Sequence, residues 1–324
     1  MENFNHFFAS ANTALGFQNN FKYINNENKK GYQYILKGGP GTGKSTLLKT
    51  IGKHFEKRGE NVEYFHCSSD PKSLDGIRLV RKNISIVDGT APHTTEASIP
   101  KVKNEIVDLG IFIDESVQKH DENIRHFLEK KSRCYVLAYN YLNALKPIFE
   151  NKIILEKNSL LQNTNSKLLK GLNFKRKEYD FYPRILFSSF FTCEGIKELK
   201  NESFRVINLE VNFYQDNITL KEIITKLTEQ KISYISCPNL IDSNYLDALI
   251  IPSAQLIIKA SYPYHSKDKD INFLINSLSK LAGKQIEDAI TFHKEVEKFY
   301  ISSMDFKSIN KLTKTLIKKI EKQN

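Results

Sequence analysis

The chain has 324 residues, of which 40% are hydrophobic and 26% charged, as in a globular protein with one large domain or two ordinary ones. The net charge of +11 comes from 40 Lys against 8 Arg, spread along the chain among Glu and Asp, which is typical of an AT-rich genome and disfavours nucleic-acid binding. Four isolated cysteines without a CxxC pair, no signal-peptide pattern and no apolar run of about 20 residues predict a cytoplasmic protein that does not enter a membrane.

The first strong signal is a glycine-rich loop between a predicted strand and a predicted helix. Residues 32–37 (YQYILK) are short, aromatic and apolar, which is typical of a buried strand. The loop itself, GGPGTGKS (38–45), matches G-x-x-x-x-G-K-[ST] in full. The residues after it have apolar side chains at helical spacing: Leu47, Leu48, Ile51 and Phe55. Motif and setting together predict a phosphate-binding P-loop.

Each residue type in this loop has a chemical reason. Its glycines let the backbone curl so that N–H groups point at phosphate oxygens, and the dipole of the next helix adds positive potential. We expect Lys44 to bridge the β- and γ-phosphates and the Ser45 hydroxyl to bind Mg²⁺. The predicted cofactors are therefore ATP and Mg²⁺. The predicted binding residues are Gly38, Gly39, Pro40, Gly41, Thr42, Gly43, Lys44, Ser45 and Thr46.

Two apolar runs downstream reach an aspartate, and one acid is expected beside the metal. NISIVDGTAPH (83–93) contains Asp88, and GIFIDES (110–116) contains Asp114 followed by Glu. We predict that Asp88 serves the magnesium shell, through water. Asp114 stays as the alternative, because an Asp-Glu pair ends the corresponding strand of many ATPases. Residues 101–110 (KVKNEIVDLG) are predicted to form a short helix, so that GIFIDES would connect helices.

An internal repeat supports this choice of acid. Its segments keep their order with small gaps: 7–17 matches 186–196, 47–55 matches 219–227, 62–67 matches 232–237, 74–77 matches 246–249, and 83–93 matches 255–265. The repeat sets Cys67 against Cys237 and Asp88 against Ala260. The run ending at Asp88 thus belongs to the repeated sheet, whereas GIFIDES has no counterpart.

The turn HCSSDPKSLDG (66–76) should reach the same edge of the sheet as the P-loop. Asp70 is a candidate catalytic residue there, able to hold an acceptor hydroxyl, position a water or reach the metal. Turn formation is the alternative, since Asp-Pro is a common turn pair. Asp75 is the weaker candidate, because its counterpart Asp247 persists in the half that lacks a P-loop, which favours a structural role.

The predicted fold is α/β, with P-loop NTPase-like parallel sheets in two pseudo-symmetric halves that carry helical extensions. Residues 1–175 form the predicted half with a functional nucleotide site. Residues 176–324 form a degenerate repeat, because 207–223 (INLEVNFYQDNITLKEI) stand where a P-loop should fall and contain no Gly-Lys pair. The polar stretch 171–183 is the predicted junction. The Lys-rich final helix is expected to present a solvated face.

Taken in order, GGPGTGKS, HCSSD, SLDG and DGTAPH resemble a family of tandem P-loop proteins of low-GC Gram-positive bacteria, described only as ATPases or ATP-binding proteins. Residues 6–17 and 293–306 look similar to that family too, so the resemblance spans nearly the whole chain. It implies ATP binding with hydrolysis, residues 38–46 as the phosphate loop, and Asp88 as the acid of DGTAPH. The family's second half often has a P-loop of its own, and this chain departs from the family at that point.

These features predict a Mg-dependent ATPase with one nucleotide site, in which Lys44, Asp88 and Asp70 are the catalytic candidates. Two alternatives stay open. One is a small-molecule or nucleotide kinase, with Asp70 contacting the acceptor. The other is an ATP-dependent switch that recruits a protein partner. The expected partners are therefore ATP and an unidentified protein or small-molecule acceptor.

Overall fold

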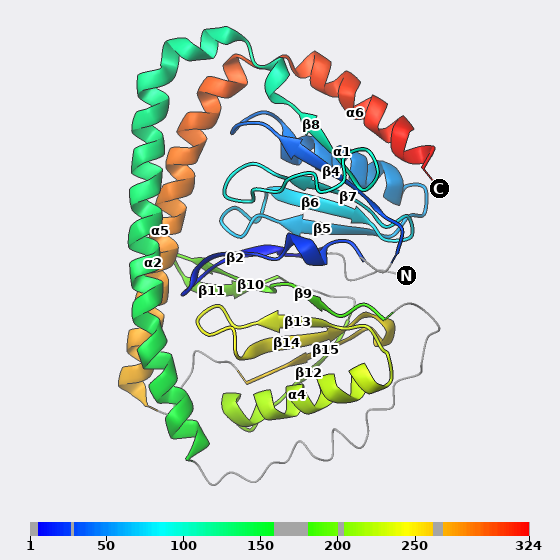
Figure 1. Cartoon of the computed structure of the whole chain (residues 1–324). Helices are drawn as coiled ribbons and strands as arrows, with labels where there is room; N and C mark the ends of the chain where they lie inside the picture. The colour runs from blue at the N-terminus through cyan, green and yellow to red at the C-terminus, as the bar shows by residue number, and fades with distance from the viewer. Residues whose placement is uncertain (1–5, 27–28, 159–180, 200–203, 262–267, 324) are drawn as a thin grey trace. The chain divides into compact units, whose positions relative to one another are not determined.

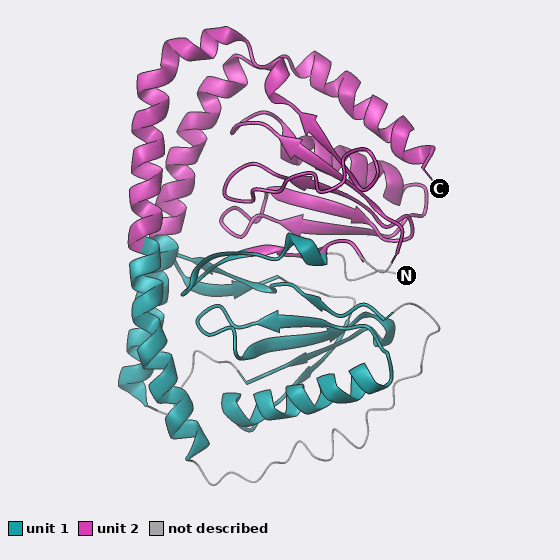
Figure 2. Ribbon diagram, in the orientation of Figure 1, with its two compact units in different colours: residues 1–4, 11–23, 138–284 teal, residues 5–10, 24–137, 285–324 magenta. Residues whose placement is uncertain are grey.

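The computed structural model describes residues 6–26, 29–158, 181–199, 204–261 and 268–323 (Figure 1). It is an α/β structure with two main sheets and long helices. The chain divides into two compact units (Figure 2). We call them the P-loop unit (residues 5–10, 24–137 and 285–324) and the repeat unit (residues 1–4, 11–23 and 138–284).

A six-stranded sheet forms the centre of the P-loop unit. In order across the sheet, its strands are β1 (His6–Phe7), β5 (Val62–His66), β6 (Leu74–Leu79), β7 (Ile84–Asp88), β4 (Tyr32–Lys37) and β8 (Asn104–Asp108). Strand β4, which leads into the P-loop, is parallel to both of its neighbours, β7 and β8. The carboxyl ends of these three strands therefore lie at one edge, where open α/β sheets bind their ligands.

The sheet is mixed, so the prediction of a parallel sheet is wrong at one strand. Strand β6 runs antiparallel to both β5 and β7. Its connections are short, residues 67–73 on one side and 80–83 on the other. A parallel crossover needs a dozen or more residues, whereas a short turn joins antiparallel strands. The predicted α/β class is nevertheless confirmed.

Helices α1 (Lys44–Glu56) and α6 (Phe306–Glu321) bury apolar faces in the core of this unit. The predicted apolar positions of α1 are buried, and α6 adds Ile309, Leu316 and Ile320, each at most 4% exposed. The expected solvated face of α6 is present, at Lys311, Lys314 and Lys318. Its opposite face is a structural part of the core, which the Lys-rich composition did not reveal.

Residues 101–110 do not form the predicted helix. Residues 104–108 are strand β8, in which Val107 lies opposite Leu36 of β4. The alternation of Ile106, 44% exposed, with Val107, 7% exposed, is that of a strand at the edge of a sheet. Two 3₁₀ helices follow, η2 (Gly110–Phe112) and η3 (Glu115–His120). GIFIDES is thus a connection, but from a strand to the long helix α2 (Asp121–Lys157).

The repeat unit contains a smaller, five-stranded sheet. In order, its strands are β9 (Arg184–Ile185), β13 (Ile235–Pro238), β14 (Leu246–Ile251), β15 (Leu256–Lys259) and β12 (Arg205–Asn208). This order repeats β1–β5–β6–β7–β4, and each pair of neighbours has the same relative direction as in the first sheet. Helix α4 (Phe213–Glu229) follows β12 as α1 follows β4. The topology therefore contains the internal repeat that the sequence indicated.

The repeat extends to a pair of small hairpins. One consists of β2 (Ser10–Thr13) and β3 (Gly16–Asn19), and the other of β10 (Ser189–Thr192) and β11 (Gly195–Glu198). In the first turn the Thr13 hydroxyl donates to the Gly16 carbonyl at 2.7 Å, and in the second the Thr192 hydroxyl donates to the Gly195 carbonyl at 2.9 Å. Both glycines have positive φ, 89° and 112°. The two turns therefore depend on the same residue types for the same reason.

The match between the two cysteines is wrong by two residues. Cys237 lies opposite Ala248 in the second sheet, and Phe65 lies opposite Gly76 in the first, with a shift of register directly after each. Since Gly76 and Ala248 are matched residues, Cys237 corresponds to Phe65 rather than Cys67. The ladder of β6 with β7 keeps the predicted match elsewhere, including Asp88 with Ala260.

The units do not follow the predicted boundary between residues 175 and 176, which itself lies outside the described residues. Each unit draws on both ends of the chain: hairpin β2–β3 belongs to the repeat unit and α6 to the P-loop unit. The helices α2 and α5 (Lys269–Ser302) contribute to both, changing unit after Leu137 and Lys284 (Figure 2). Among the described residues, no helix is long and apolar enough to cross a bilayer.

Candidate nucleotide site

The predicted P-loop connects β4 to α1 and depends on its glycines for its shape. Gly38, Gly41 and Gly43 have φ values of 158°, 70° and 85°, which L side chains rarely adopt. Gly43 forms the N-cap of α1, and no side chain makes a capping hydrogen bond there. The positive end of the α1 dipole therefore points at the loop, as an anion-binding site requires.

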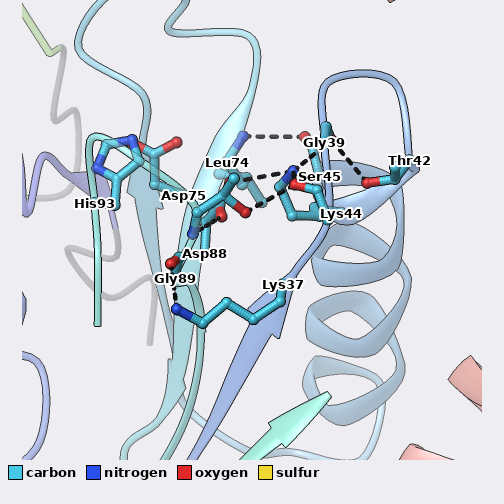
Figure 3. A network of polar contacts seen from close by, with 12 residues as sticks. Lys37, Gly39, Thr42, Lys44, Ser45, Leu74, Asp75, Asp88, Gly89 and His93 are labelled. Carbon is cyan, nitrogen blue, oxygen red and sulfur yellow. Dashed lines mark hydrogen bonds and ion pairs between the residues drawn. The ribbon is translucent and has the colours of Figure 1, made fainter. Parts of the chain in front are cut away.

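Lys44, the first residue of α1, lies across the loop. Its Nζ donates to the carbonyls of Gly38 at 2.7 Å and Gly39 at 2.8 Å (Figure 3). The same Nζ lies 3.6 Å from Oδ2 of Asp88, and both side chains are 13% exposed. The structure thus brings together the predicted cation and the predicted acid, which come from a helix and from the neighbouring strand.

The hydroxyl groups of the loop have defined roles. Ser45 Oγ accepts a hydrogen bond from the Leu74 backbone N–H at 3.0 Å, which holds it at the start of α1 (Figure 3). The buried Thr42 hydroxyl donates to the Gly39 carbonyl at 2.9 Å and stabilises the curl of the loop. Pro40 is partly exposed within the loop, and Thr46 is exposed on the first turn of α1.

Asp88 ends strand β7, opposite Leu36 of the P-loop strand. Its Oδ1 accepts from the Thr90 N–H at 2.8 Å, and the Thr90 hydroxyl donates to the Gly38 carbonyl at 2.8 Å. On the other side, Lys37 Nζ donates to the Gly89 carbonyl at 2.9 Å (Figure 3). The DGT sequence after β7 is therefore bonded to the P-loop, and it orients Oδ2 toward Lys44.

The rival acid, Asp114, has a different setting. It is the N-cap of η3: its Oδ1 accepts from the Ser116 N–H at 2.9 Å, and its own N–H donates to the Ser303 carbonyl at 2.7 Å. Helix capping explains this residue without a ligand. A further acid that sequence reasoning did not consider, Asp108, ends β8 beside the P-loop strand, and its Oδ1 accepts from the Gly110 N–H at 2.7 Å.

Asp70 lies in the connection between β5 and β6. Its carbonyl accepts from the Ser73 N–H at 2.8 Å, and its Oδ1 makes a long contact of 3.3 Å with the Lys72 N–H, so it does form a turn. Its neighbour Ser69 accepts from the Tyr135 hydroxyl of α2 at 3.0 Å. The predicted turn at Asp70 is therefore present.

Asp75 and His93 form a buried pair at the same edge of the sheet. Asp75 Oδ2 lies 3.4 Å from His93 Nε2, and both residues are under 9% exposed (Figure 3). Burial raises the pKa of Asp75 to about 6, against a lowering effect of His93. Its counterpart Asp247 is also buried, and it accepts from Asn239 at 2.7 Å and from Ser189 at 3.2 Å. Both acids thus have structural partners of their own.

The equivalent place in the repeat unit carries the opposite charge. Asn217 Oδ1 accepts from the Leu246 N–H at 2.6 Å, as Ser45 Oγ accepts from the matched Leu74. This equivalence sets the fully buried Asp216 at the position of Lys44, where it accepts from the Ser261 N–H at 2.8 Å. A buried carboxylate repels a phosphate group. The structure therefore gives a physical reason why only the first half is expected to hold a nucleotide.

The long helices contribute three further polar residues near the loop, which sequence reasoning missed. Glu297 of α5 packs its backbone against Gly41, His293 of α5 lies 3.7 Å from the Glu297 carboxylate, and Lys131 of α2 lies 3.1 Å from His293. His293 and Glu297 belong to the segment 293–306 that resembles the family, but the resemblance gave them no role, and Glu297 is 253 positions after Lys44 (297 minus 44). Only the packing of α2 and α5 within the P-loop unit reveals their proximity.

The residue types fit a magnesium–nucleotide complex. A glycine loop, an ammonium group, a hydroxyl and a carboxylate meet at one sheet edge, which is the donor set for triphosphate oxygens and a hard cation. Within the described residues, no cluster of three or more His, Cys, Asp or Glu could hold a metal ion alone. Mg²⁺ is commonly held by one or two protein groups together with phosphates and water, so the set present suits it.

Comparison with known proteins matched one family, Nephrocystin 3, N-terminal (NPHP3_N), over residues 15–108. That domain is associated with P-loop NTPases, and the matched range includes the P-loop and ends with β8. Neither the curated proteins nor the solved structures yielded a match. The N-terminal region is thus similar to an NTPase-associated domain.

Proposed function

We propose that this protein binds Mg-ATP in the P-loop unit and hydrolyses it at this single site. The observation that carries the proposal is the approach of Lys44 Nζ to within 3.6 Å of Asp88 Oδ2, across a glycine loop at the start of α1. The similarity of residues 15–108 to an NTPase-associated domain supports it independently.

In this proposal the loop residues 38–46 surround the phosphates. Their N–H groups and the α1 dipole neutralise phosphate charge, and Lys44 exchanges the Gly38 and Gly39 carbonyls for phosphate oxygens. Ser45 and Asp88 would hold the magnesium ion, Asp88 through water. The metal would supply charge neutralisation on the transferring phosphoryl group.

A phosphotransferase is the second candidate. In this candidate Asp70, in the turn between β5 and β6, would contact the acceptor hydroxyl. Phosphate appearing on an added acceptor rather than in water would promote this candidate. Tight binding with negligible turnover and no acceptor would instead favour a nucleotide-dependent switch.

The test is Lys44→Ala, with Lys53→Ala as matched control, since Lys53 is exposed on the same helix. Loss of a charge-assisted phosphate contact is expected to weaken ATP binding by roughly 10- to 100-fold, and phosphate release should fall to background. The control should bind and hydrolyse ATP like wild type. Wild type that fails to bind ATP, or Lys44→Ala that binds and hydrolyses it normally, would refute the proposed function.

A further inference from the structure

Two aspartates lie opposite each other at the edge of the sheet that carries the P-loop. Strands β6 and β7 are antiparallel, and Gly76 lies opposite Val87. One step toward the start of β6 and one step toward the end of β7 bring Asp75 opposite Asp88. Opposite residues project from the same face of a sheet, with Cβ atoms about 4.5–5.5 Å apart. The two carboxylates are therefore neighbours (Figure 3).

Asp75 also lies beside the residues proposed to serve the nucleotide and its metal. Its sequence neighbour Leu74 donates the backbone N–H to Ser45 Oγ at 3.0 Å. Its cross-strand neighbour Asp88 lies 3.6 Å from Lys44 Nζ. Burial is the main cause that raises the pKa of Asp75, the charge of Asp88 raises it further, and the charge of Lys44 lowers it. A second carboxylate thus stands next to both Ser45 and Asp88.

The corresponding acid of the repeat unit has a hydrogen-bond donor at each carboxylate oxygen. Asp247 Oδ1 accepts from Asn239 at 2.7 Å, and its Oδ2 accepts from the Ser189 hydroxyl at 3.2 Å. Opposite this acid lies Ala260, whose N–H donates to the Asp247 carbonyl at 3.0 Å. Of the two matched positions, only the one in the P-loop unit therefore pairs two acids.

The donors that complete the acid of the repeat unit have weaker replacements at Asp75. By the register of the sheets and hairpins, the same two positions in the P-loop unit hold Cys67, whose thiol is a weak donor, and Ser10. Within the described residues, neither Ser10 Oγ nor Asp75 Oδ2 makes a hydrogen bond, although Asp75 is only 5% exposed. His93 Nε2 is 3.4 Å from this oxygen without hydrogen-bond geometry. A buried carboxylate oxygen of this kind requires a donor or a cation.

We propose that Asp75 is the second acid of the nucleotide site, and that its carboxylate holds a water molecule of the magnesium shell beside Asp88. Like charges directly opposite each other destabilise a sheet, and a divalent cation near both offsets their repulsion. Mg²⁺ usually keeps several waters in proteins, and the groups that hold them orient the ion. This inference rests on the proposed function and adds to it a residue that positions the metal.

The test measures binding of Mn²⁺, a paramagnetic substitute for Mg²⁺, to the protein with ATP and to the protein alone. Asp75→Asn keeps the shape of the side chain and removes its charge, so it should bind Mn²⁺ roughly tenfold more weakly than wild type. Its affinity for ATP without metal should not fall, because no phosphate contact is lost. Asp247→Asn is the matched control, since it changes the same strand position in the repeat unit, and its Mn²⁺ affinity should equal that of wild type.

A second variant leaves both acids in place. Cys67→Asn offers Asp75 the amide donor that its counterpart in the repeat unit accepts from Asn239. Because this donor competes with the metal-bound water for the same carboxylate, Mn²⁺ affinity should fall in this variant too. Cys67→Asn therefore tests the inference even where Asp75→Asn does not fold.

Equal Mn²⁺ affinities of wild type and Asp75→Asn would overturn the inference and leave the proposed function standing. Loss of metal-free ATP binding together with Mn²⁺ binding in Asp75→Asn would also overturn it, because Asp75 would then support the fold of the site and not the metal. Wild type that binds no ATP would refute the proposed function. The Mn²⁺ titration of the protein alone then decides the inference: weaker binding by Asp75→Asn upholds the acid pair, and equal binding refutes it.

Discussion

Asp88 and Asp114 have the same chemistry and different surroundings. Asp88 ends a strand beside the P-loop strand and approaches Lys44, whereas Asp114 caps a short 3₁₀ helix. The repeat favoured Asp88 from the sequence, since β7 has a counterpart in the second half and GIFIDES has none. The structure adds the reason for its orientation: the Thr90 N–H holds one carboxylate oxygen and leaves the other toward Lys44.

This difference predicts opposite outcomes for two similar substitutions. Asp88→Asn should lower Mg-dependent phosphate release by roughly 10- to 100-fold, because under the proposed function Asp88 holds metal-bound water with the charge that this variant loses. Nucleotide binding without metal should persist, since the loop is intact. Asp114→Asn should leave turnover unchanged. Assays of phosphate release against Mg²⁺ concentration check both variants. A loss of turnover in Asp114→Asn but not in Asp88→Asn would mean that Asp114, and not Asp88, serves the metal.

Among the elements, the P-loop combines two demands on the same glycines. Gly41 needs a left-handed backbone with φ of 70°, and it also accepts the close approach of α5. Gly59, in the turn after α1, has a similar φ of 79° but open space around its Cα. Substitutions at both positions strain the backbone, but only a substitution at Gly41 also meets neighbouring atoms. Comparing the two therefore separates the free energy lost to backbone strain from the free energy lost to steric crowding.

Gly41→Ala should accordingly destabilise the protein more than Gly59→Ala. Each pays roughly 1 kcal/mol for a left-handed alanine, and Gly41→Ala adds about 1–3 kcal/mol for overpacking against the α5 backbone. Urea unfolding measures the free energies of both variants. Equal losses would show that α5 does not press on the loop.

At the scale of the whole molecule, each compact unit contains segments from distant parts of the chain. Apolar side chains of α6, some 200 residues later in the chain, form part of the core beside the sheet that carries the P-loop. Conversely, hairpin β2–β3, near the start of the chain, belongs to the repeat unit. A chain cut at the predicted boundary, 1–175, would therefore lack Ile309, Leu316 and Ile320. Contiguous halves are not the structural units.

We predict that a chain ending at Asp305 loses roughly 5 kcal/mol or more of stability, since each buried Leu or Ile contributes about 1.5–3 kcal/mol. That is comparable to the whole stability of an ordinary domain. The milder Ile320→Ala should cost about 2–4 kcal/mol. Replacing exposed Lys311, Lys314 and Lys318 with Gln should change the urea midpoint little. A shortened chain that unfolds at the wild-type midpoint would contradict the role of α6 in the core.

Sequence alone identified the P-loop with its strand and helix, the repeated order of segments, and Asp88 as the acid to test. These features depend on local chemistry, such as glycines at positive φ, apolar spacing and residue types at strand ends. Tertiary structure decided the direction of β6, the strand at 104–108, the register of Cys237 and the placement of Glu297 at the loop. Each of these depends on pairing or packing between segments far apart in the chain, whose free energy no local pattern records.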